Sequence, residues 1–229
     1  MRYLSPLIPW LNRENSLPDF SFLEFGTPEF NTGGFLALDV CYPIHEVTKH
    51  PSKSLGQTWI EVREYIRSAL EIIDSDSPGW LDSEEVEMIK EELPNPPVRS
   101  YPIYIVTVGE KTEERIVYIG KTSSNANRFL GGHSVALKLH HPDYNNLRKR
   151  VYFCCVVFLM NKEYLPLEWV SPIETAESIL DSVESQLIYT FKPELNTQKK
   201  GRNYSKHPIN LHIQNFTDSK LLNDKFIRS

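Results

Sequence analysis

The sequence predicts an α+β fold in which a small three-stranded sheet, mixed or antiparallel, is flanked by helices and preceded by a mainly helical N-terminal extension. Residues 103–108 and 115–119 are β-branched and aromatic runs separated by a polar stretch, which is typical of a hairpin. Residues 151–160 are apolar throughout and predict a third, central strand. Elsewhere in the chain, apolar residues recur at three- and four-residue spacing, which predicts the helices.

The first helices are expected at residues 56–74 and 83–93. Trp59, Val62, Ile66, Leu70 and Ile73 place an apolar stripe on the first of them. A further helix is expected at residues 124–139, with a Ser/Asn cap and a basic first turn. The first 55 residues give no assignment beyond a short apolar stretch at residues 35–40.

The best-marked helix is expected from residue 172 to about residue 191. Ser171 suits its N-cap, Pro172 its first turn and Glu174 the reciprocal capping-box position. Projected at about 100° per residue, Glu184 falls inside the apolar arc, toward one edge. A carboxylate there needs a cation, a metal ion, hydrogen bonds or an escape to solvent.

Charge divides the chain near Pro94-Asn95-Pro96-Pro97, which cannot continue a helix. Residues 1–95 carry 7 Lys/Arg against 17 Asp/Glu, a net charge of -10, and the remaining residues carry 18 against 13, a net charge of +5. A nucleic-acid site therefore belongs after residue 96, unless the asymmetry is only one of solvated faces. We expect an acidic extension at 1–95, a domain at 98–200 and a basic segment at 201–229.

No apolar run is long enough to span a bilayer, and the first residues do not form a secretory signal, so a cytoplasmic location is expected. Three cysteines cannot build a disulfide framework or a four-ligand zinc site. Cys154 and Cys155, inside an apolar run, are expected to be core residues.

Two tyrosines of the hairpin are candidates for a shared site. Paired residue numbers in a hairpin have a constant sum, and a turn between Lys111 and Thr112 places Tyr104 opposite Tyr118 or its neighbour. A one-residue slip would put the two phenols on opposite faces, and ordinary packing is the alternative explanation for them.

Taken together, the motifs resemble the GIY-YIG endonuclease family over about residues 101–200. In order along the chain these motifs are Pro102-Ile103-Tyr104, Tyr118-Ile119-Gly120-Lys121-Thr122, Arg128, Glu184 and Lys192-Pro193-Glu194-Leu195-Asn196. The order hairpin, helix, strand, helix is also that of the family's small fold. Proline replaces the first glycine of the first motif, and the loop between the tyrosines is slightly longer than usual.

The resemblance implies a metal-dependent endodeoxyribonuclease that hydrolyses phosphodiesters in double-stranded DNA with one Mg²⁺ or Mn²⁺ ion per active site, held by Glu184. It implies Tyr104 as general base, Tyr118 as the residue orienting water or phosphate, and Arg128 as the stabiliser of phosphate charge. Asn196 would hydrogen-bond within the site and fix the end of the glutamate helix. Gly120, in the second motif, would support the active site.

Three further assignments accompany this site. Lys121 is a cation near the phenols and a weaker candidate. His133 is also a candidate, although it follows the arginine by five residues and a regular helix would turn it to another face. The basic run after Asn196, with Lys199, Lys200 and Arg202, either grips the phosphate backbone or is a solvated segment.

The expected activity is site-specific and restriction-enzyme-like, because the catalytic unit stands nearly alone with one extension. The alternatives are a structure-specific repair or recombination nuclease and a non-catalytic DNA-binding module that keeps the fold. A cutter of palindromic sites is expected to act as a homodimer or as two monomers in succession.

Overall fold

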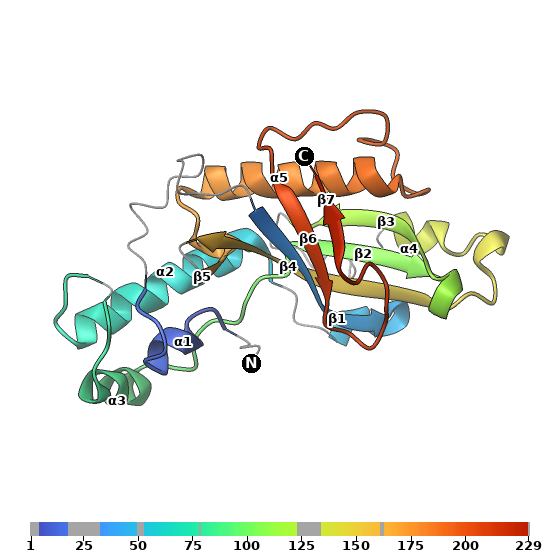
Figure 1. The fold of residues 1–229 in the computed structure, drawn as a ribbon. Helices are drawn as coiled ribbons and strands as arrows, with labels where there is room; N and C mark the ends of the chain where they lie inside the picture. Colours follow the sequence, from blue (N-terminus) through green and yellow to red (C-terminus); the bar gives the residue numbers. More distant parts are fainter. Residues whose placement is uncertain are drawn as a thin grey trace.

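The computed structural model describes residues 5–17, 33–49, 53–77, 79–122, 134–160 and 163–228, which form a mixed sheet with helices packed on it (Figure 1). The strands are β1 (Gly33–Pro43), β2 (Ile103–Val108), β3 (Arg115–Lys121), β4 (Lys149–Met160), β5 (Glu163–Pro166), β6 (Asn210–Asn215) and β7 (Lys225–Ile227). The α-helices are α1 (Ile8–Leu11), α2 (Leu55–Ile72), α3 (Ser83–Glu92), α4 (Ser134–Lys138) and α5 (Ile173–Phe191). Short 3₁₀ turns are η2 (Ile44–Lys49), η3 (Lys111–Glu113), η4 (Pro142–Tyr144) and η5 (Leu167–Trp169).

The described part of the chain forms a seven-stranded sheet in the order β3-β2-β4-β1-β6-β7, with β5 paired to β4. Strand β2 is antiparallel to both β3 and β4, and β4 is antiparallel to β1. The pairing of β1 with β6 is parallel. Strand β3 therefore lies at one edge of the sheet, where α5 packs beside it.

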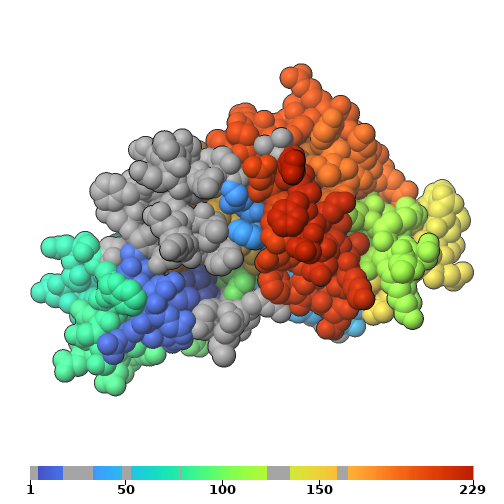
Figure 2. All heavy atoms as spheres, viewed as in Figure 1, coloured from blue at the N-terminus to red at the C-terminus, as the bar shows by residue number. Residues whose placement is uncertain are grey.

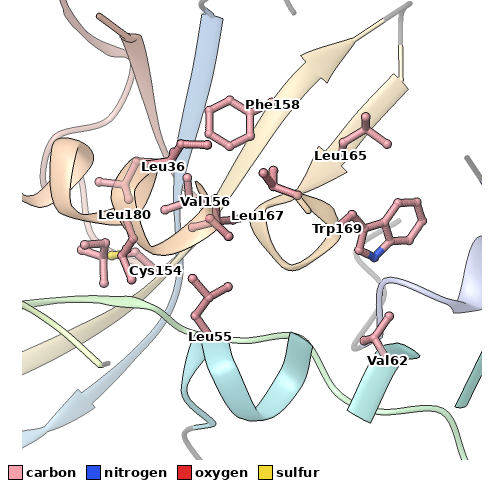
Figure 3. Packing of buried hydrophobic residues seen from close by; sticks show 14 of the residues in the cluster. Leu36, Leu55, Val62, Cys154, Val156, Phe158, Leu165, Leu167, Trp169 and Leu180 are labelled. Atoms are coloured by element: carbon pink, nitrogen blue, oxygen red, sulfur yellow. The ribbon is translucent and has the colours of Figure 1, made fainter. Parts of the chain in front are cut away.

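The two faces of the sheet bury separate clusters because side chains alternate along each strand. On β2, Ile103 and Ile105 enter the larger cluster, while Tyr104, Val106 and Val108 enter the smaller one. Figure 3 shows the larger cluster, where side chains of the central strands meet those of α2, η5 and α5. The smaller cluster contains residues of α4 and η4. The sheet is thus covered on both faces.

The predicted helices α2 and α3 are confirmed, and each begins with a capping box. Ser54 accepts a hydrogen bond from the Gln57 amide, and the Gln57 side chain accepts one from the Ser54 amide. Asp82 and Glu85 form the same reciprocal pair in α3. These bonds satisfy amides that a helix start leaves without partners.

Helix α5 is confirmed, but the prediction of its N-cap is wrong. The helix begins at Ile173 with Pro172 as N-cap, and no side chain caps it. Because the start lies one residue later than predicted, Ser171 is outside the N-cap and Glu174 is not at the capping-box position. Strands β2, β3 and β4 lie where the sequence predicts them.

The α+β class is confirmed, but the described residues form a sheet of seven strands rather than three, and the N-terminal extension adds a strand to it beside the helices α1, α2 and α3. Residues 33–43 form β1, a central strand, and the basic C-terminal segment supplies β6 and β7. Figure 2 shows these last residues, in red, covering the middle of one face of the molecule. The three predicted segments therefore contribute strands to one sheet, while their separate roles stay predictions.

Two predictions about composition can be compared with the fold. Cys154 and Cys155 are buried in β4, as expected of core residues. Among the residues described above, no helix is long and apolar enough to cross a membrane.

Candidate active site

Tyr104 and Tyr118 lie on the same face of the hairpin because β3 contains a bulge. Val106 pairs with Tyr118 but Thr107 pairs with Ile116, so Val117 is an extra residue in β3. Without it, the register of the turn would continue and Tyr118 would face the other side of the sheet. The ring centroids of the two tyrosines are 5.9 Å apart, with 30° between the ring planes.

Gly120 supplies the space in which the two phenols meet. It pairs directly with Tyr104 across the hairpin. A Cβ atom at Gly120 would lie 2.4 Å from the Tyr104 hydroxyl oxygen and 2.8 Å from a ring carbon of Tyr118. Only glycine fits between these rings. Tyr104 is fully buried, whereas Tyr118 is half-buried. Of the two phenols, Tyr118 is therefore the one in contact with solvent.

Lys121 connects this strand to helix α5. Its ammonium group pairs with the carboxylate of Asp181, and α5 packs against β3 at this point. Asp181 precedes Glu184 by three residues, so the two carboxylates are neighbours on the helix surface, with Cβ atoms about 5–6 Å apart. Lys121 pairs with Ile103 across the hairpin, so this ion pair fixes α5 on the face of β3 opposite to Tyr104 and Tyr118.

Glu184 is partly buried and contacts a cation that was not assigned to it from the sequence. Its side chain is 13% exposed, and its Oε2 atom pairs with the ammonium group of Lys199, which is 24% exposed. Lys199 adopts a left-handed backbone conformation, with φ 64°. The carboxylate on the apolar arc is thus compensated by a lysine from the basic segment.

Asn196 binds the main chain of β3. Its side-chain oxygen accepts a hydrogen bond from the Ile119 amide at 2.9 Å, and its side-chain nitrogen donates to the Ile119 carbonyl at 2.8 Å. The Leu195 amide donates to the Val117 carbonyl at 2.9 Å. The segment after α5 therefore runs along the open edge of β3 and supports the bulge.

Glu194 adds a second anchor for this segment. It accepts hydrogen bonds from Arg115 at 2.5 Å and from the Tyr144 hydroxyl at 2.8 Å. Burial, together with the adjacent carboxylate of Glu194, raises the pKa of Tyr144 to about 12. The carboxylate of Glu194 therefore joins β3, the 3₁₀ turn η4 and the segment after α5.

The basic run after Asn196 is docked on α5, and we call residues 199–207 the strap. Three serines at one-turn spacing, Ser178, Ser182 and Ser185, hold it. Ser185 accepts from the Tyr204 amide at 2.7 Å, and Ser182 accepts from the amide of Lys206 at 3.0 Å. The strap is docked through its backbone, while Arg202, Tyr204 and Lys206 are exposed, so both predicted roles of this run stay predictions.

The strap presents cations and an aromatic ring. Lys200 is half-buried, while Arg202 is exposed and its guanidinium lies 5.7 Å from the ring centroid of Tyr204. Tyr204 is itself 60% exposed. Tyr189 of α5 is also exposed, with Lys192 over its ring. Sequence reasoning did not single out Tyr189 or Asp181, because their contacts with Lys192 and Lys121 appear only in the folded structure.

Arg128 and His133 lie outside the described residues, so their predicted places in the site remain predictions. The structure brings together the other assigned residues in two groups joined by β3. Tyr104, Tyr118, Gly120 and Asn196 form the first group. Glu184, Lys199 and the strap form the second.

A divalent cation can be tested against this arrangement. In the part of the chain that is described, no group of three or more His, Cys, Asp or Glu side chains gathers to hold a metal ion. Mg²⁺ commonly uses only one or two protein carboxylates and completes its shell with water and substrate phosphate. Glu184, a partly buried carboxylate that already attracts a cation, fits a single ion of this kind.

No protein-family model matches the chain, and no curated protein and no solved structure matches it. The resemblance to GIY-YIG endonucleases therefore rests on the sequence motifs and stays a prediction.

Proposed function

We propose that the protein is a Mg²⁺- or Mn²⁺-dependent endodeoxyribonuclease of the GIY-YIG type that cuts double-stranded DNA at specific sites in the cytoplasm. One observation carries the proposal: the bulge at Val117 puts Tyr104 and Tyr118 together over Gly120. Tyr104 lies on β2 and Tyr118 on β3, the strand that packs against the helix of Glu184. Two phenols that meet in this way are a suitable base and water-orienting pair for phosphodiester hydrolysis.

The residues divide the chemical work. Glu184 would hold the cation, which supplies charge neutralisation at the phosphate when it is bound. Tyr104, as a phenolate that has released its own proton to solvent, would accept the proton of the attacking water, and Tyr118, which is more exposed, would orient that water or the phosphate. Lys121, whose ammonium pairs with Asp181, is a weaker candidate for a cation near the phenols. Arg128 would stabilise the charge of the phosphate in the transition state.

The DNA duplex would lie over the strap, which supplies Lys199, Lys200 and Arg202 as phosphate contacts. Residues 204–206 of the strap are held to α5 by hydrogen bonds, so the backbone that follows these cations is ordered before DNA arrives. Preordering lowers the entropy lost on binding. A palindromic recognition site would require two copies of the chain, acting together or in succession.

Incubation of the purified protein with mixed-sequence plasmid DNA and Mg²⁺, followed by sequencing of fragment ends, tests the proposal. Glu184→Gln should lower the cleavage rate by about 10³-fold, as expected when a group that stabilises transition-state charge is lost. Glu177→Gln, an exposed glutamate of the same helix, is the matched control and should cut normally. We expect discrete fragments that share one short motif.

Other results would redirect the proposal. Cleavage restricted to branched or flapped DNA would indicate a structure-specific nuclease. DNA binding without cleavage in Mg²⁺ or Mn²⁺ would indicate the non-catalytic module. Undiminished cleavage by Glu184→Gln would contradict the role of this carboxylate.

The tyrosine assignment has its own test. Tyr104→Phe and Tyr118→Phe keep the packed rings and remove one hydroxyl each, so a loss of activity reports chemistry rather than packing. Tyr104→Phe should lower the rate of a single turnover more than Tyr118→Phe. The reverse order would make Tyr118, the phenol nearer to solvent, the base.

A further inference from the structure

The ion pair between Lys199 and Glu184 joins the two activities that the proposed function requires. Glu184 is the carboxylate assigned to the cation, and Lys199 belongs to the strap assigned to DNA phosphate. The structure places the lysine ammonium on one carboxylate oxygen of Glu184. Lys199, from the proposed DNA-binding surface, therefore contacts the carboxylate that is proposed to bind the metal ion.

Two cations compete for this carboxylate. An ammonium group and a divalent ion on the same oxygen atoms repel each other, and the pair is only 24% and 13% exposed, so water screens that repulsion weakly. Lys199 must move aside before Glu184 can bind a metal ion fully. Lysine can do so, since its charge sits on a flexible four-carbon stem.

The strap shows how Lys199 can move without unfolding. The hydrogen bonds that dock the strap on Ser182 and Ser185 come from residues 203–207, several residues beyond Lys199. Lys199 itself has a left-handed backbone and is followed by Lys200, Gly201 and Arg202. The docking of the strap therefore does not depend on the side chain of Lys199.

We propose that Lys199 is a resident counter-ion of Glu184 that nucleic-acid phosphate draws away, so that DNA binding uncovers the carboxylate for the divalent cation. The inference rests on the proposed function. A phosphate near the strap offers Lys199 an alternative anion, and its own charge attracts the metal ion that replaces the lysine. Binding of DNA and binding of the cation are then coupled, and the coupling must be reciprocal.

The consequence is a nuclease whose metal site is weak until a strand is in place. Without DNA, the Lys199 ammonium keeps the charge of Glu184 neutralised. With DNA, the lysine contacts phosphate and the carboxylate is released. Removing the lysine charge should strengthen metal binding in the absence of DNA while it weakens DNA binding.

The experiment measures Mn²⁺ binding by the full chain, by calorimetry and by the electron paramagnetic resonance signal of free Mn²⁺. Lys199→Met keeps the aliphatic stem and removes the charge. Without DNA it should bind Mn²⁺ on the order of tenfold more tightly than the wild type, a coupling typical of linked sites. Lys206→Met is the matched control, because it removes the same charge from an exposed position of the strap.

A second measurement adds a short mixed-sequence DNA duplex. DNA should tighten Mn²⁺ binding by the wild type and by Lys206→Met, and it should do so less for Lys199→Met, whose carboxylate is already uncovered. Fluorescence anisotropy of labelled duplex should show the reciprocal effect of Mn²⁺ on DNA affinity.

Glu184→Gln distinguishes a failure of the counter-ion inference from a failure of the proposed metal site. If this variant loses Mn²⁺ binding but Lys199→Met binds Mn²⁺ no more tightly than the wild type, the counter-ion inference is overturned and the proposed metal site stands. An equal gain in Lys206→Met would also overturn it, since a general loss of positive charge would explain both. If Glu184→Gln binds Mn²⁺ as the wild type does, the proposed metal site itself fails.

Discussion

Glu114 and Glu184 are both carboxylates withdrawn from water beside a cation, yet their surroundings differ. The Glu114 side chain is 2% exposed and pairs with Arg150. It also accepts hydrogen bonds from the Thr107 hydroxyl at 2.7 Å and from the Tyr152 hydroxyl at 2.8 Å. Glu184, by contrast, forms its ion pair within the described residues with one flexible side chain, that of Lys199.

This difference separates a structural carboxylate from one suited to ligand exchange. The partners of Glu114 come from β2 and β4 and use both of its oxygens, so a change at any of them leaves a buried polar group unpaired. A guanidinium also holds its geometry, whereas an ammonium is a mobile point charge. Burial of a charge alone therefore does not identify a functional site; the kind of partner does.

The largest effect should come from removing the charge of Glu114. We expect Glu114→Gln to lower the free energy of unfolding by about 3 kcal/mol, because it leaves Arg150 without its anion in a buried position. Glu184→Gln should lower it by no more than about 1 kcal/mol, since Lys199 can turn to water. Urea denaturation compares the two, with the exposed Glu113→Gln as control. Equal losses for Glu114→Gln and Glu184→Gln would remove the distinction.

The tyrosine half of the site should resemble Glu114 in its rigidity. Gly120→Ala inserts a methyl group against Tyr104 and Tyr118, so it should cost about 2 kcal/mol of stability through overpacking and should abolish cleavage. Gly33→Ala is the matched strand control, since a Cβ there would meet no atom within 4 Å. Thermal unfolding and plasmid cleavage measure both effects. A Gly120→Ala protein with normal stability and activity would contradict the close meeting of the two rings.

Asn196 should have a smaller effect. Asn196→Ala removes two buried hydrogen bonds to Ile119 in the edge strand, so we expect a loss of about 1–2 kcal/mol. Hydrogen exchange at the Ile119 amide should become faster. Asn145→Ala changes an exposed asparagine and should leave that exchange rate unaltered. Unchanged protection in Asn196→Ala would mean that the edge is held by other contacts.

The smallest expected effect concerns Glu168, a buried carboxylate with a main-chain partner. It accepts a hydrogen bond from the Ser100 amide at 2.6 Å, and burial raises its pKa above the ordinary glutamate value. The folded state then binds the proton more tightly than the unfolded chain. The resulting stability is fully present below the unfolded pKa and is lost as the pH rises through the folded pKa.

Glu168→Gln keeps an acceptor for Ser100 and cannot ionise. It should flatten the decline in stability with rising pH from the ordinary glutamate range upward, as measured by urea denaturation across that range. Glu174→Gln, on the exposed surface, should keep the wild-type profile. A Glu168→Gln profile identical to that of the wild type would show that this carboxyl does not contribute to the pH dependence.

Local patterns in the sequence predicted much of the secondary structure. The helices α2, α3 and α5 and the strands β2, β3 and β4 follow from apolar periodicity, β-branched runs and capping residues, which act over one or two turns. The sequence also named Tyr104, Tyr118, Glu184 and Asn196 as candidate site residues, and their roles stay predictions. Their order along the chain does not depend on how the elements pack.

The tertiary structure alone decided three features. Strand β1 forms because residues 33–43 pair with β4 and β6, which lie far away in the chain. The shared face of the two tyrosines depends on an extra residue at Val117, and strand register is set by pairing rather than by local preference. The ion pair of Glu184 with Lys199 needs the strap to fold back on α5. Periodicity acts between near neighbours, whereas register and distant charge pairs depend on contacts that exist only after the chain has folded.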